Sequence, residues 1–104
     1  MHYDGNIVKF DHSVDRGFYH IISAFYNIIE KKGYKDVVLD FSETSYLSPQ
    51  AMLPLVAKCR FYRSLGVDFE IKFPTVIAAK NIILNANWAH LIIPEKYDSE
   101  LDKN

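Results

Sequence analysis

Cysteine, tryptophan and long apolar runs are scarce in this chain of 104 residues. A single cysteine, Cys59, excludes an internal disulfide framework and is typical of a reducing compartment. The single tryptophan, Trp88, suits either a core position or the rim of an interface. No run approaches the roughly 18 apolar residues that a membrane span needs, and no secretion signal is recognisable. We therefore expect a soluble, cytoplasmic protein without a membrane span.

An excess of charge of either sign is also missing. Lysine and arginine number 12 against 13 acidic residues, for a formal net charge of −1. The lysines at 31, 32 and 35 gather near one expected turn, but Glu30 and Asp36 interleave with them. Because phosphate neutralisation dominates nucleic-acid affinity, this pattern argues against a nucleic-acid partner.

Motifs that carry chemistry are absent as well. The four glycines are scattered, and neither a P-loop nor a G-x-G-x-x-G fingerprint occurs. The four histidines lack metal-ligand spacing, so we expect no metal and no cofactor. Cys59 has the pattern of a buried, inert thiol. No motif marks a Ser–His–Asp triad, although such a triad is spatial and stays open. We expect a protein that is not an enzyme.

Helical periodicity is the strongest positive signal. Apolar residues recur at helical spacing from 15 to 32, and Gly33 suits the end of that helix. A second helix is predicted over 48–65, where Pro54 implies either a kink or a regular helix that begins only near Pro54. The expected inward face of the second helix is Met52, Leu53, Leu55, Val56, Cys59 and Tyr62.

Four strands are predicted, at 5–10, 37–41, 67–73 and 91–93, with a third helix over 75–85. Strict alternation in the third strand predicts one solvated face, so helices should cover mainly one side. The order strand, helix, strand, helix, strand, helix, strand predicts an α/β fold with about four mostly parallel strands and about three helices. We expect one domain over 1–94 and a polar tail at 95–104 that is a linker or disordered.

The segment D-V-V-L-D-F-S-E-T-S-Y-L-S-P-Q-A-M, residues 36–52, is the most informative part of the chain. Asp40 ends a buried strand, and Ser48-Pro49 starts a helix. Open α/β folds place ligands and partners at such loops. Asp40 is either a cap of the strand end or a partner contact. The hydroxyls of Thr44, Ser45 and Ser48 serve either turn and N-cap chemistry or a phosphate.

This segment, followed by a helix and G-V-D-F-E-I-K-F, resembles the STAS domain of bacterial anti-sigma-factor antagonists. The family places a polar residue at the strand end, an apolar pair, and then D-S-S-G-L at the helix start. Asp40 matches the strand end and Tyr46-Leu47 the apolar pair, whereas Gln50 stands where the family has its phosphorylated serine. The segments F-P-T-V and N-W-A-H-L-I-I-P resemble a STAS-like domain found with histidine-kinase-type ATPase domains.

The resemblance implies a non-enzymatic regulatory domain that docks a protein partner, an ATPase or kinase-like domain in cis or in trans, through 44–52. A homodimer is left open. The alternative is a sensor of a small anion or nucleotide that uses the helix N-terminus at 48–51. The expected contact residues are Asp40, Thr44, Ser45, Tyr46, Leu47, Ser48, Pro49, Gln50 and Met52.

Overall fold

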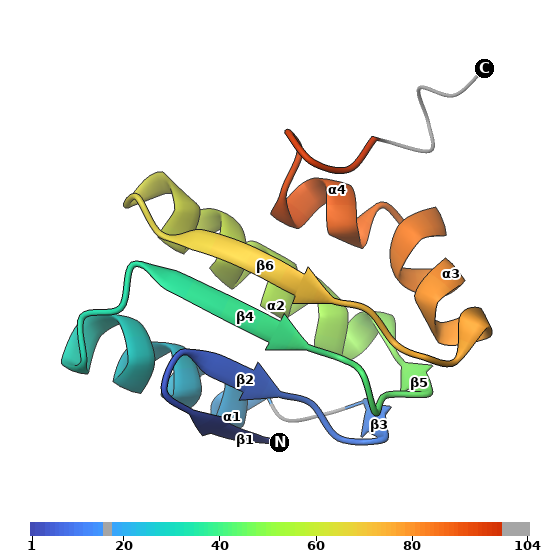
Figure 1. Ribbon diagram of the computed structural model, residues 1–104, viewed down its shortest axis with the longest axis horizontal. Coiled ribbons are helices and arrows are strands. Elements are labelled where there is room, and N and C mark those ends of the chain that lie inside the picture. The colour runs from blue at the N-terminus through green and yellow to red at the C-terminus, as the bar shows by residue number, and fades with distance from the viewer. Residues whose placement is uncertain (16–17, 99–104) are drawn as a thin grey trace.

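A four-stranded sheet forms the centre of the fold in the computed structural model, which describes residues 1–15 and 18–98 (Figure 1). β2, β4 and β6 are parallel, and β1 pairs antiparallel with β2 through a tight hairpin. The chain is thus a small α/β fold with a mixed sheet, and three of its four predicted strands are confirmed. In spatial order the strands are β1 (His2–Asp4), β2 (Ile7–Lys9), β4 (Asp36–Asp40) and β6 (Asp68–Lys72).

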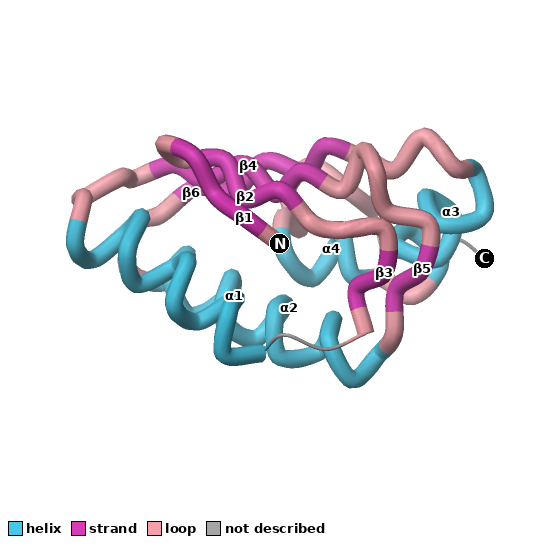
Figure 2. The backbone as a smooth tube through the Cα atoms, turned by 90° about the horizontal axis from the view of Figure 1, so that it is seen from below, coloured by secondary structure: helices cyan, strands magenta, loops and turns pink. Residues whose placement is uncertain are grey.

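The helices lie on one side of this sheet, as the alternation in β6 predicted (Figure 2). The helix predicted over 15–32 is observed as α1, which continues as a π-helical segment, η1; residues 16–17 lie outside the described part. Gly33 follows with a φ of +77°, a left-handed conformation that favours glycine. The helices are α1 (Phe18–Phe25), η1 (Tyr26–Lys31), α2 (Pro49–Ser64), α3 (Ile77–Asn85) and α4 (Trp88–Ile92).

The predicted fourth strand at 91–93 is wrong. Residues up to Ile92 belong to the short helix α4. Trp88 and Ile92 are four residues apart and both buried, so one face of a helical turn packs inward. Asn87, with a φ of 63°, makes the left-handed bend that separates α3 from α4.

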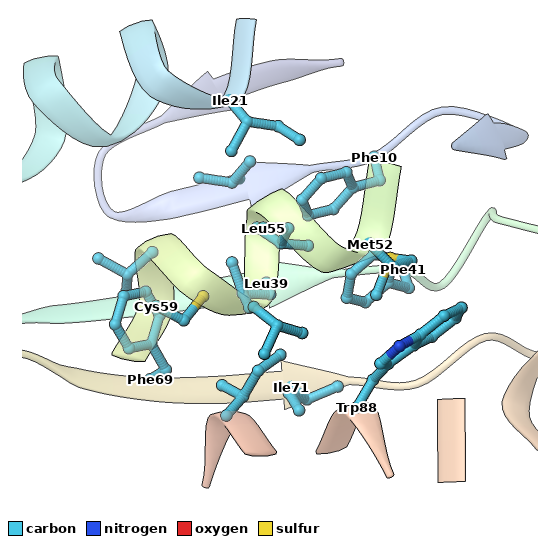
Figure 3. Close-up of a cluster of buried hydrophobic side chains, with 14 of the residues drawn as sticks. Phe10, Ile21, Leu39, Phe41, Met52, Leu55, Cys59, Phe69, Ile71 and Trp88 are labelled. Atoms are coloured by element: carbon cyan, nitrogen blue, oxygen red, sulfur yellow. The ribbon is translucent and has the colours of Figure 1, made fainter. Parts of the chain in front are cut away.

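The core lies between the sheet and its helices (Figure 3). Val8, Leu39 and Ile71 stand side by side in register on β2, β4 and β6, and all three are buried. Cys59 is fully buried, as predicted, and Trp88 is a core residue with 5% of its surface exposed. The predicted inward face of α2 is confirmed except at Leu53, which is 57% exposed.

α2 is continuous from Pro49 to Ser64 and contains Pro54 within it. The alternative in which the regular helix begins near Pro54 is therefore wrong. Since proline has no N–H, the carbonyl of Gln50 lacks the donor that residue 54 would supply in an unbroken ladder.

The other face of the sheet is open. Asp68, Glu70 and Lys72 alternate outward along β6 and are exposed. In β4, Val38 points the same way and is half-buried between its neighbours Ile7 and Glu70. The expected solvated face is thus confirmed for β6.

The segment after α4 turns back against the domain. Glu95 pairs with Arg63 at 2.5 Å, and the ring of Tyr97 packs edge-on against Phe73 with centroids 5.4 Å apart. Residues 99–104 of the predicted tail lie outside the described part. Among the helices of 1–15 and 18–98, none has the length and apolar character to cross a membrane.

Candidate functional site

The predicted docking loop is joined to an earlier segment of the chain. Residues 44–48 run alongside 11–15, and the two segments form a small parallel sheet of β3 (Ser13–Val14) and β5 (Tyr46–Leu47). This small sheet lies beside the carboxyl end of the main sheet (Figure 1). Its bonds run from Thr44 Oγ1 to the Asp11 carbonyl (2.8 Å), from the Ser45 and Tyr46 amides to the His12 carbonyl (2.8 and 3.1 Å), and from the Ser48 amide to the Val14 carbonyl (2.8 Å).

The hydroxyls of the loop have structural partners. Thr44 is fully buried. Ser48 is the N-cap of α2: its Oγ accepts from the Ala51 amide and donates to the Asp15 carbonyl, both at 3.4 Å. Of the two roles that the sequence left open for these hydroxyls, N-cap chemistry describes Ser48, whereas the Thr44 hydroxyl fits neither role and bonds the Asp11 carbonyl of the neighbouring segment.

Asp40 lies near the end of the central strand with 7% of its surface exposed, between Lys9 and Lys72 in register. Burial raises the pKa of its carboxyl, but hydrogen bonds from Ser42 and the charges of Lys72 and Lys9 outweigh that effect and lower the pKa. The Ser42 amide donates to Asp40 Oδ1 at 2.9 Å. These contacts are those of a strand-end cap, because the Asp40 carboxylate is hydrogen-bonded within the chain itself.

Some of the predicted contact residues are exposed, and others are buried in the core. Tyr46 is 52% exposed, and Pro49 and Gln50 are also exposed, whereas Ser45 is half-buried. The side chains of Leu47 and Met52 belong to the core, so they cannot form a contact surface as they stand. The exposed residue beside Met52 is Leu53.

Further apolar side chains are exposed where α3 begins. Val76 and Ile77 are 45% and 73% exposed. α3 packs beside β5 (Figure 1). The Thr75 amide, just before α3, donates to the Ser42 carbonyl, just after β4, at 3.4 Å, and this bond joins the loops that follow β6 and β4. We call the exposed residues around this corner the corner surface: Tyr46, Pro49, Gln50, Leu53, Val76 and Ile77.

The helix N-terminus offers little to an anion. The amides of Ala51 and Met52 already donate to the Ser48 carbonyl, and Pro49 has no N–H. Within the first turn of α2, only the Gln50 amide is left to meet a ligand. This arrangement weakens the alternative of an anion sensor at 48–51.

Ser45 and His12 lie in hydrogen-bond contact, although no sequence motif indicated a serine–histidine pair. Ser45 Oγ lies 2.8 Å from Nε2 of His12 and 3.0 Å from its Nδ1. A triad needs one ring nitrogen on the nucleophile and the other on an orienting carboxylate. Here both nitrogens face the same hydroxyl, and the pair lies on the surface, so the geometry is that of a loop contact.

The described residues support neither a metal site nor a cysteine nucleophile. No group of three or more histidine, cysteine or acidic side chains is placed to hold a metal ion in this part of the chain. Burial raises the pKa of the Cys59 thiol well above its usual range. Because the thiolate is the reactive form, Cys59 is unsuited to act as a nucleophile.

Comparison with protein-family models, with curated proteins and with solved structures finds no match to this chain. The STAS resemblance therefore stays a prediction.

Proposed function

We propose that this chain is a non-enzymatic, STAS-like interaction domain that docks a protein partner through the corner surface. The partner class implied by the resemblance is a histidine-kinase-type ATPase or kinase-like domain. The observation that carries the proposal is the exposure of Tyr46 on β5, Leu53 near the start of α2 and Ile77 at the start of α3, which is packed beside β5. Apolar side chains held outward near one another are typical of interaction sites.

The corner surface also rests on a rigid base. Tyr46 belongs to a strand that is hydrogen-bonded to β3, and Leu53 projects from a capped helix whose opposite face is in the core. A partner would therefore bind without first ordering a loop, which lowers the entropic cost of association. Tyrosine is also among the residues that dominate interface energies.

Pro54 adds a polar feature to this apolar surface. It prevents the usual intrahelical bond to the Gln50 carbonyl, and Gln50 is itself exposed. An interface surrounds its apolar centre with hydrogen-bonding groups. The Gln50 carbonyl and side-chain amide would supply such groups next to Leu53.

Gln50 further implies that docking is constant rather than switched at this position. A glutamine cannot accept a phosphoryl group, so the charge change that a phosphoserine would bring to the helix start does not occur here. We propose that Gln50 provides a neutral contact that phosphorylation at this position does not switch.

The proposal is tested by site-specific photo-crosslinking in cells that express the chain. A photoreactive residue at position 50 samples the corner surface, and the same residue at position 70 samples the open face of the sheet as the control. We expect position 50, and not position 70, to crosslink to one protein that carries an ATPase or kinase-like domain. The crosslink should be lost in a Leu53→Asp background.

Three results would count against the proposal. Crosslinking of equal strength from both positions would mean unspecific contact. No crosslink from position 50 would mean that the corner surface is free in the cell. A crosslink only to a second copy of this chain would assign the surface to a homodimer.

A further inference from the structure

A second candidate site lies away from the corner surface, in an open groove of about 520 Å³ between the later half of α2 and α4. Pockets for small molecules commonly have volumes of about 300 to 1,000 Å³. The groove is lined by Arg60, Arg63, Ser64, His90, Leu91 and Pro94.

The groove is built around a fixed arginine. Arg63 donates from Nη1 to the Ile92 carbonyl at 3.1 Å and from Nη2 to Glu95 Oε1 at 2.5 Å. These bonds tie α2 to the end of α4 and hold Arg63 in place at the groove. On α4, His90 Nδ1 lies 2.6 Å from the Tyr97 carbonyl, which can only accept, so Nδ1 carries the proton and the ring is held in place.

The charge of the groove is positive and small. Glu95 cancels the charge of Arg63, which leaves that of Arg60. Arg60 is exposed and forms no ion pair with any residue of 1–15 or 18–98. Its planar guanidinium is suited to a carboxylate, which it can bind through two parallel hydrogen bonds.

Apolar surface lies next to this charge. Leu91 and Pro94 line the same groove, and they can pack against a ligand's hydrocarbon body. We propose that the groove binds a small monocarboxylic acid, with its carboxylate on Arg60 and its apolar body against Leu91 and Pro94. The charge of Arg60 would neutralise a doubly charged phosphate monoester only in part.

The test is a titration followed by backbone amide chemical shifts, with three soluble probes that share one ring. Benzoate carries one charge, benzamide carries none and phenyl phosphate carries up to two. We expect benzoate to shift amides in 60–64 and 90–94 in a saturable way, with a Kd of about 1 mM. Benzamide should produce no saturable shift, and phenyl phosphate should bind no more tightly than benzoate.

Two variants test whether the carboxylate of benzoate contacts Arg60. Arg60→Gln removes the free cation and should weaken benzoate binding about tenfold, as expected for the loss of a charge-assisted hydrogen bond. Lys31→Gln removes one positive charge from an exposed site at the end of η1, well apart from α4 (Figure 1), and should leave the Kd unchanged.

The inference is overturned if benzoate produces no saturable shift at these amides. Equal binding of benzamide, or equal weakening by both variants, would also overturn it, because the charge of Arg60 would then not select the ligand. Tighter binding of phenyl phosphate than of benzoate would overturn the assignment to a monocarboxylate. None of these outcomes bears on the corner surface, whose test uses other positions.

Discussion

Met52 and Leu53 are neighbours in α2 and differ completely in environment. Met52 is fully buried and Leu53 is 57% exposed. A helix turns by about 100° per residue, so adjacent residues can face the core and the solvent. The difference decides which of the two can meet a partner, because only an exposed side chain is available without unfolding part of the core.

This pair gives the first prediction, on stability. Met52→Ala should lower the free energy of unfolding by about 2 to 5 kcal/mol because it leaves a cavity in the core. Leu53→Ala should change it by less than about 0.5 kcal/mol, as is usual at the surface. Urea denaturation of both variants measures the difference, and a similar loss in both would mean that Leu53 is packed.

Tyr62 allows a prediction about alkaline pH. Burial, together with a 2.9 Å hydrogen bond to Glu30, raises the pKa of Tyr62 to about 12. In the unfolded chain its pKa is about 10. Between these values the unfolded state releases the proton first, so the stability that Tyr62 contributes below pH 10 is lost as the pH rises to 12.

We therefore expect the wild-type chain to lose about 2 to 3 kcal/mol more stability than Tyr62→Phe between pH 10 and pH 12. At pH 8 the variant should be less stable by about 1 kcal/mol, since the bond to Glu30 is lost. Denaturant unfolding at a series of pH values checks both. Parallel pH profiles for the two proteins would show that the Tyr62 hydroxyl titrates normally in the fold.

At the scale of elements, the two long helices and three short strands were predictable, whereas the short run at 91–93 was not. The ranges 15–32 and 48–65 carry several turns of apolar periodicity, and helices are observed there. The run at 91–93 has only three residues, too few to separate a strand from a helical turn. Packing decided the outcome, because Trp88 and Ile92 bury one helical face.

The strand β1 was missed, although the sequence contains a signal for it. Gly5 and Asn6 form a two-residue turn between Asp4 and Ile7, and Gly5 has a φ of +57°. Two-residue Gly-Asn turns between two short strands are typical of hairpins. A three-residue strand next to the N-terminus gives too little pattern to be recognised without weighing that turn.

Pro54 allows a prediction about the stability of the helix α2. Pro54→Ala restores a donor for the Gln50 carbonyl and relieves the clash of the ring with the preceding turn, so it should stabilise the chain by about 1 to 3 kcal/mol. If the Gln50 carbonyl contacts the partner, the same variant should bind the partner more weakly. Thermal unfolding and partner affinity measure the two effects. A variant that is less stable than the wild type would contradict this account of α2.

At the scale of the whole molecule, the open face of the sheet carries charge across three strands. Lys9, Asp40 and Lys72 form one row in register on β2, β4 and β6. Lys9 also pairs with Glu43 at 3.3 Å. The carboxylate of Asp40 thus lies between two cations. Burial raises its pKa, but the hydrogen bonds from Ser42, and after them the charges of Lys72 and Lys9, lower it overall.

The row of Lys9, Asp40 and Lys72 predicts how the free energy of unfolding changes as the pH falls. Because its folded pKa is lowered, ionised Asp40 stabilises the fold above the unfolded pKa of about 3.9, and this contribution is lost as the pH falls through the folded value. The advantage of the wild type over Asp40→Asn should therefore be largest near neutral pH and shrink below about pH 4. Urea titrations across pH measure it; an advantage that grows in acid would contradict the lowered pKa.

The sequence predicted part of the exposed surface near the start of α2, but it did not predict which residues of that segment are buried. The carboxyl end of β4 and the start of α2 are where the sequence placed the candidate site, and Tyr46, Pro49 and Gln50 are exposed there. Burial of Leu47 and Met52 depends on β3 and on the core, which are formed by residues distant in the sequence. Leu53 could have been recognised, since it lies three residues after Gln50 on the polar side of α2.

Leu53 and Phe61 provide the most direct test of the docking proposal. Both are large apolar residues on α2 with similar exposure, 57% and 52%, and they lie eight residues, or about 12 Å, apart along the helix. The measurement is the affinity of each aspartate variant for the protein captured through position 50. We predict that Leu53→Asp weakens binding at least tenfold, equal to about 1.4 kcal/mol, while Phe61→Asp binds like the wild type. Equal affinity of Leu53→Asp and the wild type would contradict the assignment of the corner surface.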